Sequence, residues 1–301
     1  MNENKNGTKI LIVVLVALVA VLLAVVAFLL GKSAGEKNNP AETPVTNAPV
    51  TETGELPTQP IPTVPAVPGE TPAAPATTLP VAPVIAGVPQ NLDIDVSAGN
   101  LTFTEGDAFN VDYDDGVIVV RESGDTLLIE NKYDHPTASQ RRRMDVTVTV
   151  PVGYVFNDVD VELGAGKLIV HTLRAEGLEM ELGAGSASID DIHISGSASI
   201  REGAGELNVK SGEIHNLDLQ CGAGATRVSA AVTGTSRVVA AVGAVDLNFT
   251  GDKASYTVAF RMGLGACYYD GEKIARSGEY GAGPNRIDIN GGLGVMRVNV
   301  G

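Results

Sequence analysis

Hydrophobic and polar residues alternate along the last two thirds of the chain, and a short glycine-centred pattern recurs within this alternation. The first five intervals between its lead glycines are 19 to 21 residues long, and the seven lead positions are Gly164, Gly183, Gly203, Gly222, Gly243, Gly263 and Gly292. Six copies have a second glycine two residues later, whereas the fifth has Val245 there. A fixed period near 20 residues is typical of a solenoid, in which each repeat buries its apolar side by stacking on its neighbours.

Equivalent positions of the seven copies support this interpretation. Side chains of a strand point alternately to its two faces, so five positions in each copy are expected to face a shared interior. Of these 35 residues, 32 are apolar, and the exceptions are Glu202, Thr226 and Gly291. The pattern predicts an all-β fold, a single-strand-repeat β-solenoid with about 20 residues in each coil.

The glycines fit a bend repeated at the same place in every coil, because glycine adopts positive φ and crowds no neighbour. A nucleotide-binding loop is the alternative glycine-rich pattern. Such a loop opens a helix after one strand, and its phosphate-loop form ends in Gly-Lys-Ser/Thr. Here the glycines lead into strands. The segment Gly281-Ala282-Gly283 is followed by Pro284, so we expect Asp270–Arg286 to be a loop inserted into one coil.

Residues 1–31 contain a candidate membrane anchor. Ile10–Leu30 is a run of 21 uncharged, mostly aliphatic residues, which at about 1.5 Å per residue matches the roughly 30 Å core of a bilayer. A cleaved signal peptide has a shorter apolar region and a small-x-small site, whereas Lys32 follows this run. The sequence predicts an N-terminal, single-pass transmembrane helix.

Residues 32–91 have the composition of a disordered stalk. Lys37–Gln90 holds 13 of the 16 prolines and no aromatic residue, so it cannot bury a core and is expected to extend as a semi-rigid spacer. Positive charges are nearly balanced across the predicted span. The spacer suits passage through a cell wall, so we expect the protein in the cell membrane with its C-terminal domain outside the cytoplasm.

Residues 92–301 are long enough for one sizeable core. Before the first repeat, alternating runs predict short antiparallel strands that cap or start the solenoid: Leu101–Glu105, Phe109–Tyr113, Val117–Glu122, Thr126–Lys132 and Asp145–Pro151. Cys221 and Cys267 both occupy inward positions, two coils apart in sequence order. That separation exceeds the range of a disulfide, so we expect two buried core cysteines.

The net charge of −15 disfavours nucleic acid and anionic lipid as bulk partners, since both require a positive surface. The one basic run is Arg141-Arg142-Arg143. It could bind a phosphate-bearing wall polymer or lipid headgroup, but a solvated loop that balances nearby acids is the simpler interpretation.

Candidate chemistry is sparse. His171, His193 and His215 lie at different positions relative to their lead glycines, so we expect solvent-facing residues that do not converge on a metal. The run Asp112–Gly116 resembles part of a calcium loop, but it lacks the downstream glutamate and the regular oxygen spacing, so an acidic hairpin turn is expected.

Two acidic features remain. Asp190-Asp191 resembles the carboxylate pairs of glycan-cleaving β-helix enzymes, yet neighbouring strand residues should point to opposite faces, and the chain has no Trp for sugar stacking. Glu202 is the one charge among the inward positions, so it should be paired, protonated or turned outward. Arg201 or a polar group of a neighbouring coil could satisfy it. We assign no catalytic, cofactor-binding or metal-ligating residue.

With the repeats aligned, residues 92–301 resemble a bacterial family of candidate adhesins built from β-strand repeats, catalogued as a domain of unknown function. The resemblance rests on the strand Asp145–Pro151, on Val159–Val170 and on the glycine-containing coils as far as Val245. It implies a surface-exposed β-solenoid, similar to a fold found in membrane proteins that respond to cell-wall antibiotics. The family offers no catalytic residue to carry over.

Together these features predict a membrane-anchored, non-enzymatic cell-envelope protein that presents a β-solenoid for surface contact or envelope-stress sensing. A cell-wall polymer or an envelope protein is the expected kind of partner, and nucleic acid is not. The alternative is a glycan-active β-helix enzyme.

Overall fold

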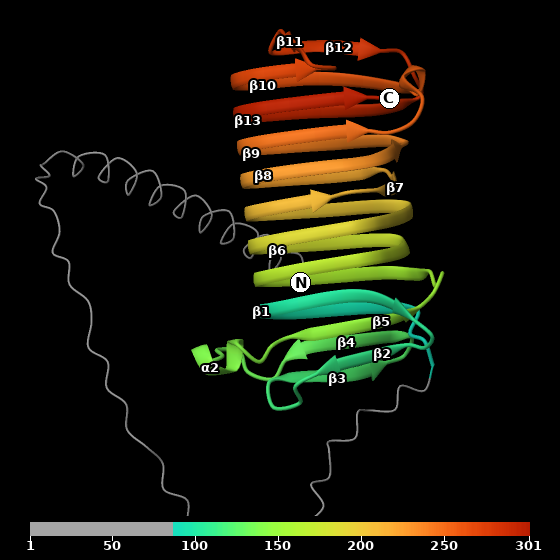
Figure 1. Cartoon of the computed structure of the whole chain (residues 1–301), viewed down its shortest axis with the longest axis vertical. Coiled ribbons are helices and arrows are strands. Elements are labelled where there is room, and N and C mark those ends of the chain that lie inside the picture. Colours follow the sequence, from blue (N-terminus) through green and yellow to red (C-terminus); the bar gives the residue numbers. More distant parts are fainter. Residues whose placement is uncertain (1–86) are drawn as a thin grey trace, which may run out of the picture. The chain divides into compact units, whose positions relative to one another are not determined.

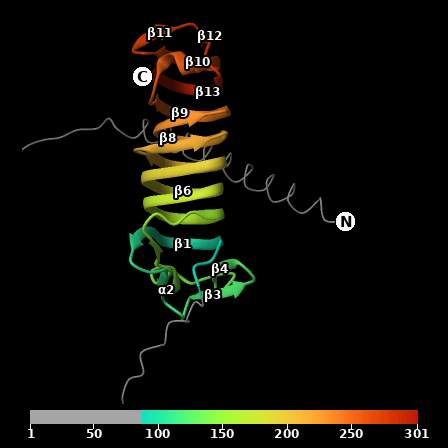
Figure 2. The ribbon, with the colours of Figure 1, turned by 90° about the vertical axis from the view of Figure 1, so that its right-hand side faces the viewer.

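The computed structural model describes residues 87–301, which form one 13-stranded sheet wound into a solenoid (Figure 1 and Figure 2). The predicted anchor and nearly all of the predicted stalk lie outside these residues. Between residues 87 and 301, no helix has the length and apolar character needed to cross a membrane. The elements are β1 (Asn91–Gly106), β2 (Asn110–Tyr113), β3 (Ile118–Ser123), β4 (Thr126–Asn131), α2 (Ala138–Arg141), β5 (Val146–Pro151), β6 (Phe156–Val209), β7 (Gly212–His215), β8 (Leu217–Thr233), β9 (Thr235–Phe249), η1 (Lys253–Ser255), β10 (Tyr256–Tyr269), β11 (Glu272–Ile274), β12 (Ser277–Gly281) and β13 (Asn285–Val300).

Parallel pairing of successive coils places their apolar residues in one shared core. Ile200 pairs with Leu219, which pairs with Val238. All three side chains are at most 1% exposed. The predicted stacking of inward positions is therefore confirmed for these coils.

Each coil turns an elbow at a short segment that ends in glycine, with the sequence Gly-Ala-Gly in four of the coils. Gly205 shows why this last glycine is needed. Its φ is +151°, a value that residues with a side chain rarely adopt. A Cβ atom at Gly205 would lie 1.8 Å from the carbonyl oxygen of Gly185 in the preceding coil. The elbows thus stack too closely for any side chain at this position.

The register of the fifth coil differs from the sequence alignment by two residues. Gly243 pairs with Gly224, so it is the second glycine of its elbow, and Ala241 occupies the lead position. Val242, predicted to face inward, is 39% exposed at the elbow. A shift of two residues preserves the alternation of buried and exposed positions, which is why the pattern could not reveal it.

The coils do not stack in sequence order. β13, the last strand, lies between β9 and β10 and is parallel to both. The segment predicted as a loop, Asp270–Arg286, contains β11 and β12, which pair antiparallel with β10. The chain therefore forms a short cap of β11 and β12 beyond β10. It then returns as β13 to the position between β9 and β10. Short strands with charged residues at the edge of a sheet oppose edge-to-edge aggregation.

The N-terminal end was only partly predicted. β1 is a complete coil, parallel to β6 with Gly99 opposite Gly166, and its elbow begins with Ser97 instead of glycine. β4 and β5 extend the two halves of β1, also in parallel. Only β3 on β4 and β2 on β5 are antiparallel. β4 and β5 thus correspond to the two halves of one further coil. The repeat pattern did not predict this coil, because the stretch that contains α2 separates β4 from β5 at the place where other coils have an elbow (Figure 1).

Candidate functional site

The Asp190-Asp191 pair lies at a corner of β6 where the alternation of buried and exposed residues is interrupted. Ile189 and Ile192 are both buried, and both aspartates between them face outward from the core. Our expectation that the two carboxylates point to opposite faces is wrong, because a strand that turns a corner presents two consecutive residues to solvent. The contacts of each carboxylate then decide what the pair can do.

Asp190 is held between two basic side chains from neighbouring coils. Its carboxylate lies 2.9 Å from His171 Nδ1 and 2.5 Å from Lys210 Nζ. The hydrogen bond from Lys210, followed by that from His171, lowers the pKa of Asp190. His171, Asp190 and Lys210 each lie seven residues after a lead glycine, so they form a ladder across three coils. Lys210 was missed in the sequence, although this common spacing could have identified it.

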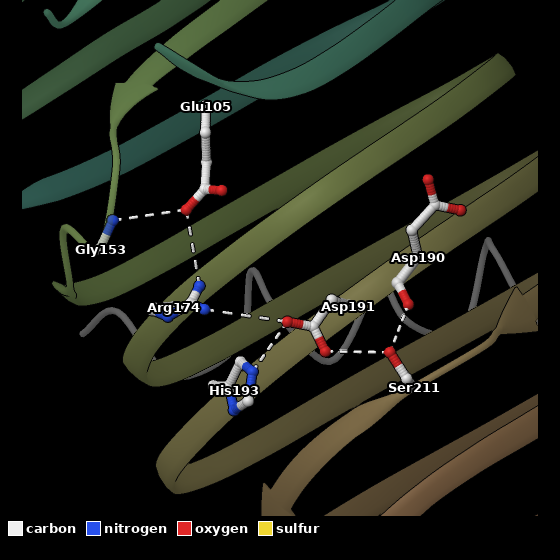
Figure 3. A network of polar contacts seen from close by, with 7 residues as sticks. All are labelled: Glu105, Gly153, Arg174, Asp190, Asp191, His193 and Ser211. Carbon is white, nitrogen blue, oxygen red and sulfur yellow. Dashed lines mark hydrogen bonds and ion pairs between the residues drawn. The ribbon is translucent and has the colours of Figure 1, made fainter. Parts of the chain in front are cut away.

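Asp191 contacts a histidine and a serine (Figure 3). Its carboxylate oxygens lie 2.8 Å from His193 Nε2 and 3.0 Å from Ser211 Oγ. The Ser211 hydroxyl also lies 2.7 Å from the carbonyl oxygen of Asp190. Ser211 thereby ties its own coil to the corner formed by the two aspartates.

Arg174 extends this network toward the N-terminal coil (Figure 3). Its Nη2 lies 3.9 Å from the Asp191 carboxylate, and its Nη1 lies 3.7 Å from Glu105 Oε1. Glu105 Oε1 also accepts a hydrogen bond of 3.4 Å from the N–H of Gly153. Contacts between charged groups therefore connect the end of β1 and the β5–β6 turn with two coils of β6.

The contacts of Asp190 and Asp191 differ from two arrangements that enzymes use. In a Ser-His-Asp triad the histidine lies between the serine and the carboxylate, whereas here Asp191 lies between His193 and Ser211. In glycoside hydrolysis by two carboxylates the general acid has a raised pKa, a role that does not suit Asp190, because its pKa is lowered. The network fits a structural role, in which side chains at the corners fasten successive coils.

Each of the three histidines considered above has its own hydrogen-bonding partner. His171 contacts Asp190, His193 contacts Asp191, and His215 Nδ1 lies 2.9 Å from Thr233 Oγ1. In the part of the chain that the structure describes, no group of three or more His, Cys, Asp or Glu residues is placed to hold a metal ion.

The acidic run Asp112–Gly116 and the arginine run bind each other. Arg143 donates two hydrogen bonds of 2.7 Å to the Asp114 carboxylate, which also accepts one from the N–H of Gly116. The bonds from Arg143 are the main reason that the pKa of Asp114 is lowered. The expected balance between the arginine run and nearby acids is thus confirmed for Arg143. The turn is not a hairpin, because β2 and β3 on its two sides pair with β5 and β4.

Glu202 lies in the core, where its residue is 6% exposed. Thr226 Oγ1 of the neighbouring β8 coil donates a 2.8 Å hydrogen bond to Glu202 Oε2. Two of the three exceptions to the inward apolar pattern therefore form one buried pair. Arg201 does not satisfy Glu202 and instead contacts Glu179 and Glu181.

The surroundings of Glu202 favour its neutral form. Burial raises the pKa of its carboxyl, and the hydrogen bond from Thr226 offsets this in part. Beside it is a hollow of about 10 Å³, space for roughly one water molecule. Burial likewise raises the pKa of Cys221 to about 11. Both Cys221 and Cys267 are free and buried, as predicted.

Glu202→Gln is expected to increase the free energy of unfolding at neutral pH. A carboxyl with a raised pKa in the fold stabilises it fully below the unfolded pKa, and this contribution is lost as the pH rises through the folded value. Glutamine keeps the shape and a hydrogen-bond acceptor but does not ionise. Urea unfolding from about pH 4 to pH 8 should show a gain over wild type that grows with pH. Glu176→Gln, at an exposed position, is the control, and the same pH slope for Glu202→Gln and wild type would contradict a raised pKa.

Carboxylates crowd one outward face of the N-terminal coils. Asp93 and Asp95 of β1 pair with Asp160 and Glu162 of β6, and Glu179 and Glu181 belong to the same run of coils. Partial shielding from water, followed by repulsion from Glu179 and Asp93, raises the pKa of Asp160. This acidic face was not singled out in the sequence, although its residues occupy the same two positions in each coil.

Asp160→Asn is expected to stabilise the protein at neutral pH by less than about 1 kcal/mol, because solvent screens exposed charges. The gain should shrink as salt is added and as the pH falls below the raised pKa of Asp160. Asp218→Asn is the matched control, since Asp218 lies opposite Arg237 and its loss should not stabilise. Urea unfolding at low and high salt measures both variants. A gain for Asp160→Asn that is unchanged by salt would contradict repulsion as its cause.

A second, larger hollow lies over β7 and the neighbouring parts of β6 and β8. It has a volume of about 300 Å³, is open to solvent, and is lined by Ile194, Ser195, Glu213, Ile214, His215, Ala231 and Thr233. Enclosed small-molecule sites are typically about 300–1,000 Å³ and cover most of the ligand. An open hollow of this size does not by itself define a ligand.

The described residues thus define an all-β solenoid with about 20 residues per coil, polar ladders on its faces and antiparallel strands at both ends. A family model described as Toastrack DUF4097 matches residues 90–263, and the chain belongs to this family. The match begins at β1, in agreement with β1 being a full coil, and it ends before β11, β12 and β13. Family membership confirms the resemblance to β-strand-repeat proteins.

No curated protein matches the chain. The solved structures similar to it include a candidate cell adhesion protein from Clostridium sporogenes, 14% identical, with a TM-score of 0.29 over 71% of this chain and 92% of the other. A candidate adhesin from Bacteroides fragilis is 15% identical, with a TM-score of 0.28 over 70% of this chain and 92% of the other.

Proposed function

We propose that this protein is a non-enzymatic component of the cell envelope, anchored in the membrane by residues 1–31, that presents its solenoid for contact with another envelope component. The partner would be a cell-wall polymer or an envelope protein, and the contact would serve adhesion or the sensing of envelope stress. The apolar run Ile10–Leu30 and the proline-rich stalk support the anchored, extracytoplasmic placement.

One observation carries this proposal: the long faces of the solenoid repeat polar side chains at the same positions coil after coil. The ladder of His171, Asp190 and Lys210 is one such row. A surface of this kind offers many equivalent weak contacts to an extended partner, whereas small-molecule binding needs a concave, largely enclosed pocket. Many weak contacts gain strength when several copies act together on one surface.

The test has two parts. Protease added to intact protoplasts should remove the solenoid if it lies outside the membrane, and protection from the protease would contradict the placement. The full chain in liposomes should then retain purified wall fragments or envelope proteins, whereas the Gly205→Ala variant, in which the stacking of the elbows is destabilised, should retain less. Equal retention by both would show that the solenoid is not the contact surface.

The glycan-active enzyme is the weaker alternative, because Lys210 and His171 hold Asp190 in its ionised form. Release of soluble sugars from wall polysaccharide by the wild type, lost in both Asp190→Ala and Asp191→Ala, would overturn the non-enzymatic proposal. Absence of release by the wild type agrees with it.

A further inference from the structure

Three aliphatic side chains project from the elbows of consecutive coils at the C-terminal end of the solenoid. Val242 pairs with Leu293, which pairs with Leu264, and these residues are 39%, 52% and 62% exposed. We call them the apolar ridge. Preceding coils have alanine at this position: Ala98, Ala165, Ala184, Ala204 and Ala223. Leu264 and Leu293 also lie beyond the part of the chain that the family model matches.

The residues next to the apolar ridge are neutral or basic. Two positions after it the three coils have Ala244, Val295 and Ala266, and three positions before it they have Val239, Asn290 and Arg261. The same positions in the N-terminal coils include Glu162, Glu181 and Glu206. Large aliphatic side chains and the loss of acidic neighbours therefore occur together, at one end of the solenoid.

Two arginines lie beside Leu264. Arg276, between β11 and β12, donates a 2.9 Å hydrogen bond from Nη1 to the carbonyl oxygen of Gly263. Arg261 is exposed three residues before Leu264. Two arginines are thus available near the Leu264 end of the apolar ridge. A guanidinium group binds phosphate through several N–H donors at once.

The net charge of the chain conceals this local balance. Residues 87–216 contain 23 acidic and nine basic residues, whereas residues 217–301 contain seven acidic and eight basic ones. Salt screens charges that are more than about 8 Å apart at physiological ionic strength. A partner at the apolar ridge would therefore meet a nearly neutral end of the solenoid, while the acidic end would be repelled by an anionic surface and would turn away from it.

We infer that the apolar ridge is a membrane-contact site, at which Val242, Leu293 and Leu264 enter an anionic lipid surface and Arg261 and Arg276 bind lipid phosphates. The side chains of Val242, Leu293 and Leu264 are exposed at the elbow, so they can enter a deformable lipid surface. Packing against a second copy of the chain is the competing explanation, and the dependence of the response on lipid composition and protein density distinguishes the two. The inference rests on the proposed function only in that the anchor would keep the solenoid near a bilayer.

The test uses the full chain in liposomes, with an environment-sensitive nitrobenzoxadiazole dye on Leu293→Cys. The native cysteines are buried, so labelling should be confined to the new site. Ala165→Cys, at the elbow of an acidic coil, is the matched control. With phosphatidylglycerol in the bilayer, the dye at Leu293→Cys should shift to the blue and brighten several-fold, and spin-labelled lipid should quench it. In pure phosphatidylcholine, and at Ala165→Cys, the change should be much smaller.

Two further variants in the labelled Leu293→Cys protein separate the contribution of the apolar contact from that of the two arginines. Leu264→Ser should reduce the change through the apolar contact, and Arg261→Gln with Arg276→Gln should remove its dependence on phosphatidylglycerol. All of these positions are exposed, so unchanged unfolding curves are expected to confirm that the variants fold.

The inference is overturned if both labelled sites respond equally, if neither responds, or if the change at Leu293→Cys follows protein density and ignores lipid composition, as packing between copies would. Resistance of the liposome-bound chain to alkaline extraction is measured in parallel. Resistance without a dye response leaves the anchor in place and rejects the membrane-contact site. A dye response without resistance supports the site and rejects the anchor.

Discussion

Gly205→Ala is expected to reduce the free energy of unfolding by at least about 3 kcal/mol. Two effects add at this position. The φ of +151° disfavours any side chain, and the new Cβ would lie 1.8 Å from the carbonyl oxygen of Gly185. That oxygen belongs to a backbone paired on both sides within the stack, so it cannot move away alone. Urea unfolding followed by circular dichroism measures the loss.

Gly124→Ala is the control for a side chain placed at a positive φ without crowding by a neighbouring coil. Gly124 also has a positive φ, +62°, but a Cβ there would meet no atom within 4 Å. Alanine in this conformation should cost about 1 kcal/mol. Equal losses for the two variants would mean that the elbows are not stacked as closely as described.

Leu219→Ala is expected to cost about 2–5 kcal/mol, the usual range for a buried leucine replaced by alanine. Leu219 is fully buried between Ile200 and Val238 of the adjacent coils. Its removal would leave a cavity bounded by two coils, and the parallel pairing on both sides would limit their collapse into it. The loss should appear as a lower denaturation midpoint in urea.

Gln220→Ala, one residue further along the same strand, is the matched control. Gln220 faces outward, so its replacement should change the free energy of unfolding by less than about 0.5 kcal/mol. A similar loss for both variants would contradict the division of the strand into an inward and an outward face.

The sequence was informative wherever one physical constraint acts on every coil. Inward positions must be apolar and the last position of each elbow must be glycine, so the period and the alternation predicted the coils around Ile200 and Leu219. The fifth coil was misaligned because Ala241 fills the lead position that glycine holds in the two adjacent coils, and Gly243 alone marked the elbow. Only pairing with the neighbouring coil distinguishes the two registers.

The order of the coils and their ends depends on long-range pairing that the sequence pattern does not encode. β13 carries the same apolar alternation as β9 and β10, so it could stack beside either, and its place between them follows from the cap formed by β11 and β12. The candidate site shows the same limit. Asp190 and Asp191 were recognisable as a pair, and Lys210 could have been found from its spacing, but the corner that turns both aspartates outward and the contact of Asp191 with Ser211 are set by the stacking.

Cysteine cross-linking tests the order of the coils most directly. Val239, Asn290 and Arg261 face outward on β9, β13 and β10, with Asn290 opposite each of the other two. Mild oxidation should therefore link Val239→Cys to Asn290→Cys. The pair Val239→Cys and Arg261→Cys should stay reduced, because two rungs separate these residues by about 9.6 Å, beyond the reach of a disulfide. Efficient linkage of the second pair and none of the first would contradict the insertion of β13 and the stacking described for this end of the solenoid.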